Sequence, residues 1–257
     1  MTAVTVAARN GTGLACSAMS EHDPEDRAVT AALRRLGLAH HARRVDAARR
    51  AAALEHLHAA EALLAEGESR LRWYEVDDTD RGATRRRNRE LSAWSGSVNS
   101  VAPPVRIEEV TAPDGRRELV GRVRIDRTRE GPPRSVHGGV LAGMFDELLG
   151  GAQRLGGSLG GVTARLTVRF RRPTPIDEDL ELRAWIAEER SRRLVVKAAC
   201  RVVGADGAAS GPVTAEAEGV FLKVDFAGME AAMRERPAGT ASEPAPATET
   251  GPSETGP

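Results

Sequence analysis

Residues 130–147 read EGPPRSVHGGVLAGMFDE, and the interpretation of the whole chain depends on this stretch. It leads into the segment His137–Leu155, which is mostly apolar, contains only the acids Asp146 and Glu147, and ends at Gly156-Gly157. A run of this length favours a helix over a strand, and an apolar circumference favours burial. We therefore predict a buried central helix from His137 to Leu155.

Segments with strand character flank this helix on both sides. Val105–Val110 and Leu119–Ile125 precede it and are separated by a Pro-Asp-Gly turn at 113–115, which predicts a hairpin. Four further apolar or alternating segments follow it: Thr163–Arg171, Leu180–Glu188, Arg193–Val203 and Val213–Val224. One long apolar helix followed by consecutive strands predicts an α+β fold, in which an antiparallel sheet wraps around a central helix.

The chain outside this core is expected to be partly helical and partly disordered. Leucines at helical spacing predict two N-terminal helices, with Gly37 between them and Gly67 at the end of the second. We expect these helices to cover an apolar surface or to add to an oligomer contact, and a charged loop to lie at 77–90. The predicted regions are a disordered 1–22, a helical extension and linker at 23–95, the folded domain at 96–225, and a short helix with a disordered tail at 226–257.

Composition excludes several classes of function. Lys+Arg and Asp+Glu both total 37, so the neutral chain gives no electrostatic reason to bind nucleic acid. We expect no membrane span, because no stretch of about 18 apolar residues is present. The first twenty residues lack the pattern of a signal peptide, so we expect a cytoplasmic protein. The cysteines, Cys16 and Cys200, form no disulfide framework, and Cys200 is predicted to lie in the core. We expect no metal site, since His56 and His58 do not share a helix face.

The start of the central helix carries the residues that indicate chemistry. His137, Gly138 and Gly139 occupy its N-terminus, where unpaired N–H groups and partial positive charge are presented. Glycines there let a ligand approach the backbone closely, which suits the developing oxyanion of an acyl transfer. Asp146 lies two turns further on, and a carboxylate in a buried apolar helix is costly unless it has a partner or a task. Asp146 is therefore the candidate catalytic carboxylate.

The spacing of these groups predicts a homodimer or a higher homo-oligomer. Eight residues separate Gly138 from Asp146, which is about 12 Å along a helix. A substrate carbonyl must lie roughly 3 Å from both an N–H donor and a carboxylate or its water. Two such helices running antiparallel across a two-fold axis would bring Asp146 of one subunit to Gly138 of the other.

These motifs resemble those of the hotdog-fold thioesterase superfamily, in particular the branch of phenylacetate-pathway and THEM-type acyl-CoA thioesterases. The matching residues are Gly131-Pro-Pro, His137-Gly138-Gly139, Asp146 nine positions after that histidine, Thr163-Ala-Arg-Leu-Thr-Val-Arg-Phe170 and Arg172-Pro-Thr-Pro175. The resemblance covers roughly residues 96–225. It implies a hotdog fold that hydrolyses acyl-CoA thioesters to a free carboxylate and coenzyme A, with no cofactor besides the coenzyme A of the substrate.

The resemblance also implies roles for individual residues. Asp146 would act as general base on water or as nucleophile through an acyl anhydride, and the Gly138 N–H would polarise the thioester carbonyl. His137 would orient the loop or substrate, and Thr163 would hold the water or the carboxylate. The residues expected to bind substrate are Gly139, Glu147, Arg134 and Arg171, the arginines through phosphates of coenzyme A. Some relatives carry Asn six residues before the histidine, where this chain has Gly131, so no side-chain amide is assigned there.

Other interpretations of the same residues stay open. Asp146 is alternatively a structural carboxylate, and Glu147 is alternatively the base; the two point about 100° apart, so that only one can face the site. His137 is alternatively a helix cap, and Thr163 an ordinary strand residue. The alternative functions are a non-catalytic acyl-CoA-binding module and an enoyl-CoA hydratase or dehydratase, because one fold hosts several chemistries.

Overall fold

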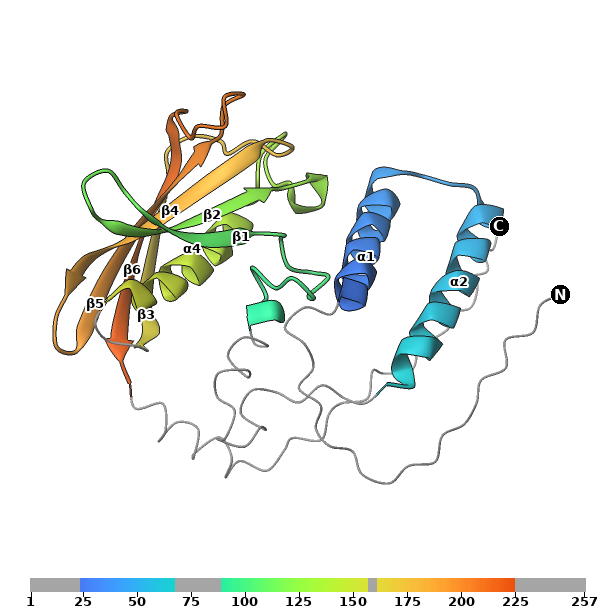
Figure 1. Cartoon of the computed structure of the whole chain (residues 1–257). Coiled ribbons are helices and arrows are strands. Elements are labelled where there is room, and N and C mark those ends of the chain that lie inside the picture. The colour runs from blue at the N-terminus through green and yellow to red at the C-terminus, as the bar shows by residue number, and fades with distance from the viewer. Residues whose placement is uncertain (1–23, 68–88, 157–160, 225–257) are drawn as a thin grey trace, which may run out of the picture.

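The computed structural model of the protein describes residues 24–67, 89–156 and 161–224 (Figure 1). The disorder predicted for residues 1–22, and the short helix and tail predicted within 226–257, lie outside the described residues. Most of the charged loop predicted at 77–90 lies outside them too.

Six antiparallel strands of the described chain form one sheet. They are β1 (Arg106–Thr111), β2 (Arg117–Arg124), β3 (Gly161–Phe170), β4 (Asp179–Glu189), β5 (Arg193–Val202) and β6 (Val213–Lys223). Their order in the sheet is β1-β2-β4-β5-β6-β3, which leaves β1 and β3 at the edges. The predicted hairpin is present, and Gly115 in its turn has a φ of 85°, a conformation that favours glycine. The strands agree with the predicted segments to within a few residues.

Helix α4 (Gly138–Ala152) packs against one face of this sheet and contacts β2 to β6 (Figure 1). Its buried side chains form one stripe: Leu141, Met144, Phe145, Leu148, Leu149 and Ala152. Spacings of three and four residues place them on the same side of the helix. The prediction of burial all round was wrong. In the single chain the sheet covers one side only, and Gly143, Asp146, Glu147 and Gly150 on the other side are half-buried.

The core between α4 and the sheet is apolar and built mainly from aliphatic side chains. Sheet residues such as Leu119, Leu182, Val196 and Phe221 are almost completely buried beneath the helix. Cys200 lies in the same core, as predicted, and burial raises the pKa of its thiol to about 11. This thiol therefore stays protonated and unreactive at neutral pH.

The N-terminal extension folds into helices α1 (Pro24–Ala42) and α2 (Ala47–Ala65). The predicted break at Gly37 was wrong, because α1 continues through it; one interior glycine costs only about 1 kcal/mol relative to alanine. The break comes instead before Asp46, whose side chain caps α2 by accepting the Arg49 N–H at 2.9 Å. Arg34 ties α1 to the linker through the carbonyl oxygen of Gly96, at 2.8 Å.

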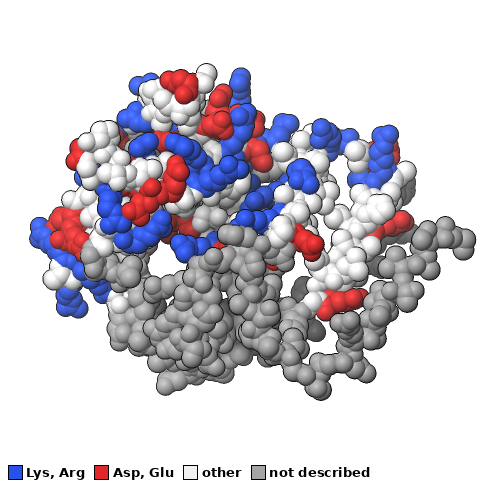
Figure 2. Space-filling view, viewed as in Figure 1, with Lys and Arg blue, Asp and Glu red and all other residues white. Residues whose placement is uncertain are grey.

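Helix α2 lies farther from the sheet than α1 and has no buried residue (Figure 1). Its packing on the described residues thus leaves none of its side chains buried, and its predicted roles, covering an apolar surface or adding to an oligomer contact, stay predictions. None of the described helices is long and apolar enough to cross a bilayer. On the face shown in Figure 2, basic and acidic side chains are interspersed, in keeping with the neutral net charge.

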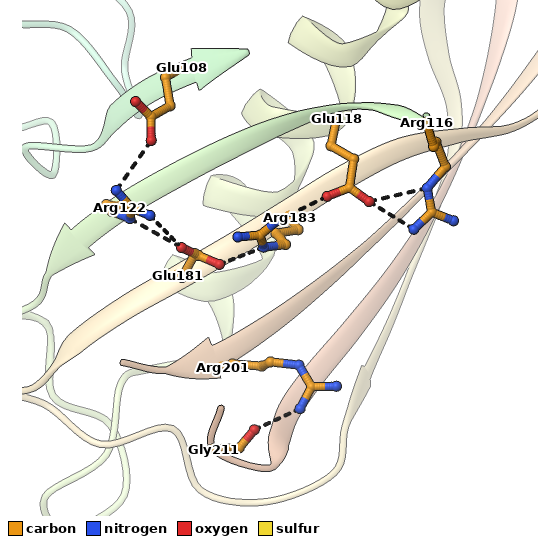
Figure 3. A network of polar contacts seen from close by, with 8 residues as sticks. All are labelled: Glu108, Arg116, Glu118, Arg122, Glu181, Arg183, Arg201 and Gly211. Atoms are coloured by element: carbon orange, nitrogen blue, oxygen red, sulfur yellow. Dashed lines mark hydrogen bonds and ion pairs between the residues drawn. The ribbon is translucent and has the colours of Figure 1, made fainter. Parts of the chain in front are cut away.

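The face of the sheet opposite α4 contains two buried glutamates (Figure 3). Glu118 on β2 and Glu181 on β4 are only 3% and 2% exposed. Arg183 bridges them, donating to Glu118 at 3.1 Å and also to Glu181. Arg116 binds Glu118 at 2.7 Å, and Arg122 binds Glu181 at 3.0 Å. Each carboxylate thus has two arginine partners, which compensates for the cost of removing its charge from water.

Replacing Arg183 by Met is expected to lower the free energy of unfolding by about 2 kcal/mol, because Glu118 and Glu181 then stay buried with one arginine each. Urea unfolding followed by circular dichroism measures the change. Arg124→Met is the matched control, since the partner of Arg124 among the described residues is the exposed Asp179 at 3.7 Å, and such pairs contribute about 0–1 kcal/mol. Equal stability of Arg183→Met and the wild type would show that Arg116 and Arg122 alone compensate the charges of the two buried glutamates.

Candidate active site

The side chain of His137, the residue just before α4, caps the N-terminus of this helix. His137 Nδ1 accepts the Gly139 N–H at 3.1 Å, so the proton of the neutral ring is on Nε2. The His137 carbonyl accepts the N–H of Val140 at 3.0 Å. The described residues provide no acceptor for the Gly138 N–H. Of the two glycines, Gly138 therefore offers a backbone donor to a ligand, whereas the donor of Gly139 is already used.

The loop before α4 explains why residue 131 is glycine. Gly131 donates to the Ser135 carbonyl at 2.9 Å, and Arg134 adopts a φ of 57° to complete the tight turn. A Cβ on Gly131 would fall 2.8 Å from the Cα of His137. The backbone at 131 thus packs directly against His137, and a side chain at this position would displace the residue that caps α4.

Asp146 lies in the second half of α4, two turns after Gly138, and its side chain is held by β3. The Thr163 hydroxyl donates to Asp146 Oδ1 at 3.0 Å. A bulge between Thr163 and Arg165 shifts the register of β3 against β6. Because side chains alternate along a strand, this extra residue turns Thr163 to the same face as Leu166 and therefore toward α4. Asp146 and Thr163 both line a cavity of about 580 Å³.

Glu147 lines the same cavity, which corrects the prediction that only one of the two acids can face the site. The separation of about 100° leaves both residues on the side of α4 that the sheet does not cover. Glu147 Oε1 accepts the hydroxyl of Ser92 at 2.7 Å and also that of Ser95. Glu147 is therefore held by two donors from the linker, whereas Asp146 has Thr163 as its side-chain partner.

The contact of the linker with α4 was missed by the sequence analysis. Trp94 packs so closely on the helix that a Cβ on Gly143 would lie 2.1 Å from its ring. The available signal was a tryptophan between Ser92 and Ser95 in a chain with only 3% aromatic residues. A long-range contact between a linker and a glycine on the helix has no periodicity, however, and this pattern alone does not predict it.

The cavity extends from the two acids toward the C-terminal end of α4. Gly150 and Gly151 lie along it, and Arg154, in the short 3-10 helix η4 (Gln153–Leu155), also lines it. Val105, Ile107 and Phe221 provide apolar parts of its wall. Along the helix the cavity wall therefore passes from the acids Asp146 and Glu147 through two glycines to Arg154, and Arg27, Arg89 and Glu90 add further charged side chains to it.

The remaining predicted residues lie outside this cavity. His137, Gly138, Gly139 and Arg134 are at the N-terminal end of α4, where the Phe170 ring lies against Gly138. Arg171 binds Glu216 at 2.7 Å in a half-exposed ion pair at the end of β3. Within one chain the structure thus brings Asp146, Glu147 and Thr163 together, and it keeps the Gly138 donor apart from them.

Three or more His, Cys, Asp or Glu side chains do not gather at a common point within the ranges that the structure describes.

The fold and the site define the class of protein. The antiparallel sheet with α4 against it is a hotdog fold, as predicted. A model of the family described as Thioesterase superfamily matches residues 134–204. The crystal structure of protein RHA08564, a thioesterase superfamily protein, is 30% identical with a TM-score of 0.59, and the match covers 76% of this chain and 93% of that one. The chain belongs to the thioesterase superfamily, which confirms the predicted resemblance.

A second relative is the acyl-coenzyme A thioesterase THEM4 of Bos taurus. It is 31% identical over 96 residues, which are 37% of this chain. The match also spans 37% of the bovine protein, so this chain corresponds to little more than a third of that relative.

Replacing Gly131 by Ala is expected to cost about 1–3 kcal/mol of unfolding free energy, because the new Cβ overlaps the backbone of His137. Gly150→Ala is the matched control. A Cβ there meets nothing within 4 Å, and alanine is favoured over glycine in a helix by about 0.5–1 kcal/mol. Urea unfolding of both variants should therefore shift in opposite directions. Unchanged stability of Gly131→Ala would contradict the tight packing on His137.

Proposed function

We propose that this protein is an acyl-CoA thioesterase, which hydrolyses an acyl-CoA thioester to a free carboxylate and coenzyme A. Membership of the thioesterase superfamily supports the reaction class. The observation that carries the proposal is Asp146, held by Thr163 at 3.0 Å on the wall of an open cavity. A half-buried carboxylate that a neutral hydroxyl orients is suited to the role of general base.

In the proposed reaction Thr163 fixes Asp146 through Oδ1 and leaves Oδ2 available. Oδ2 takes a proton from a water molecule while the water oxygen attacks the thioester carbon. The C–S bond then breaks, and the thiolate of coenzyme A leaves and takes up the proton. Attack by Oδ2 itself, through an acyl anhydride that water then hydrolyses, gives the same products. In either route the carbonyl oxygen becomes negative and requires an N–H donor nearby.

We propose that the Gly138 N–H of a second subunit supplies this donor. Strand β3 carries Thr163, which contacts Asp146, at one end and Phe170, which contacts Gly138, at the other. It is an edge strand of the single chain, and Val162 and Phe170 on it are 37% and 57% exposed. Antiparallel pairing of two β3 edges across a two-fold axis would place the Thr163 end of one strand beside the Phe170 end of the other.

Replacing Asp146 by Asn is expected to lower kcat by about 10²–10⁴-fold, because the amide cannot accept the proton. Release of free thiol from a panel of acyl-CoA substrates measures the rate. Asp179→Asn removes an exposed carboxylate outside the cavity and serves as the control. Full activity of Asp146→Asn would rule out the assigned base. Acyl-CoA binding without thiol release by the wild type would favour a binding module instead.

Gly138→Pro tests the backbone donor, because proline lacks the N–H and is well tolerated at the first position of a helix. His137, with φ −60° and ψ 131°, already has the conformation that a following proline requires. We expect kcat to fall about 10²–10³-fold. Gly138→Ala is the matched control, since it adds the same Cβ against Phe170 but keeps the N–H. Similar losses in both variants would mean that the side chain, not the missing donor, is responsible.

The same variants test whether the site is shared between subunits. A heterodimer of Asp146→Asn and Gly138→Pro contains one site with both groups intact. Random mixing gives half heterodimers with one of two sites working, so about a quarter of the wild-type rate should return. No recovery in a mixture shown by mass spectrometry to contain heterodimers would place both groups in one chain.

A further inference from the structure

The cavity that Asp146 lines is also lined by three arginines that the proposed hydrolysis does not use: Arg27, which pairs with Glu90, and Arg89 and Arg154. Arg154 follows Asp146 by eight residues, and both residues line the cavity. The rise of α4 and η4 separates their backbones by roughly 12 Å. A group bound at Arg154 would therefore lie well beyond the thioester carbon, on the side of the cavity that leads away from the N-terminus of α4.

Arg154 has no counter-ion in the described part of the chain. No hydrogen bond or ion pair joins its guanidinium to any described residue, although it is half-buried. Burial is the main reason that its pKa is lowered, and the charge of Arg89 lowers it further. The carboxylate of Glu109, which acts on it from a distance, is bound by Arg117 at 2.6 Å. A partly desolvated cation without an anion is costly unless a ligand supplies the anion.

The section of the cavity between Asp146 and Arg154 is suited to an unbranched chain. Gly150 has no side chain to fill the cavity, and a Cβ added there would meet no atom within 4 Å. Val105 and Ile107 of the first hairpin contribute apolar wall. Another acid that lines the cavity, Glu90, pairs with Arg27 at 3.4 Å. Along α4 and η4 the cavity wall thus presents Asp146, then the two glycines, then Arg154, whose guanidinium has no ion-pair partner among the described residues.

We infer that Arg154 binds a carboxylate at the distal end of the acyl group, so that the enzyme prefers acyl-CoA substrates whose acyl chain ends in a carboxylate over neutral chains of equal length. This inference rests on the proposed thioesterase function. A guanidinium suits this task because it offers paired N–H donors to the two oxygens of a carboxylate.

Coenzyme A itself is the other source of an anion for Arg154. About 14 bonds separate the thioester carbon from the first phosphorus, which is roughly 17 Å in an extended arm. That exceeds the separation of roughly 12 Å between Asp146 and Arg154. An extended arm would therefore carry its phosphate past Arg154, whereas a folded arm could reach it, and the substrates compared below distinguish these two anions.

The test compares adipyl-CoA with hexanoyl-CoA, which have acyl chains of equal length and differ in the terminal carboxylate. The wild type should show the higher kcat/KM with adipyl-CoA. Arg154→Gln should lose about tenfold to a hundredfold on adipyl-CoA, as expected for a lost charge-assisted hydrogen bond, and stay within about twofold on hexanoyl-CoA. Arg154→Lys should retain part of the preference, and Arg124→Gln, outside the cavity, should retain all of it.

Two results would overturn the inference. Equal losses on both substrates would place the anion on coenzyme A, and no loss on either would leave Arg154 without a role in binding. Thermal stabilisation by each acyl-CoA provides a readout that does not need turnover. If no substrate releases thiol, the thioesterase proposal fails. Stronger stabilisation by adipyl-CoA than by hexanoyl-CoA, lost in Arg154→Gln, would still support the anion site.

Discussion

The packing of the apolar stripe of α4 against the sheet is the constraint on which the rest of the structure depends. Leu141, Phe145 and Leu148 fix the rotation of the helix, because they must face the sheet. Once that rotation is fixed, Asp146 and Glu147 have to lie on the uncovered side, where the linker and the cavity are. The same packing fixes the position of the helix along the sheet and therefore places Gly138 against Phe170. The packing of the core thus determines where Asp146 and Glu147 lie.

Strand β3 connects the two ends of α4, and this makes its position at the edge of the sheet significant. Thr163 at its start holds Asp146, and Phe170 at its end packs on Gly138. The bulge after Thr163 allows both residues to face α4. One strand therefore contacts both regions of α4, and the proposed pairing of two subunits would use its position at the edge of the sheet. In the proposed mechanism each chain contributes both groups, but about 12 Å apart, which is farther than one substrate carbonyl can bridge.

The periodicity of the sequence was sufficient to predict the strands and α4, because each depends on local spacing and on a single packing surface. The relation of Asp146 to Thr163 came from a family motif. Contacts that depend on the path of the linker were not predictable, as with the serine hydroxyls on Glu147 and the ring of Trp94 on Gly143. The helix boundary predicted at Gly37 was wrong because a helix tolerates an interior glycine. The capping residue Asp46 was the better signal for where the second helix begins. Arg154 carried no local signal, since only the shape of the cavity relates it to Asp146.

The carboxylates of this chain provide an internal comparison between structural and chemical roles. Glu118 and Glu181 are almost fully buried, and each has two arginine partners. Their charges are compensated within the chain, so the sheet retains them as part of its structure. Asp146 has a neutral hydroxyl as its described partner, which orients the carboxylate but leaves its charge uncompensated. Among the arginines, Arg154 likewise has no ion-pair partner within the described residues. Within the described residues, Asp146 and Arg154 are two charges of opposite sign that lack an ion-pair partner on the wall of one cavity. A substrate whose attacking water gives its proton to Asp146, and whose distal anion binds Arg154, would make use of both.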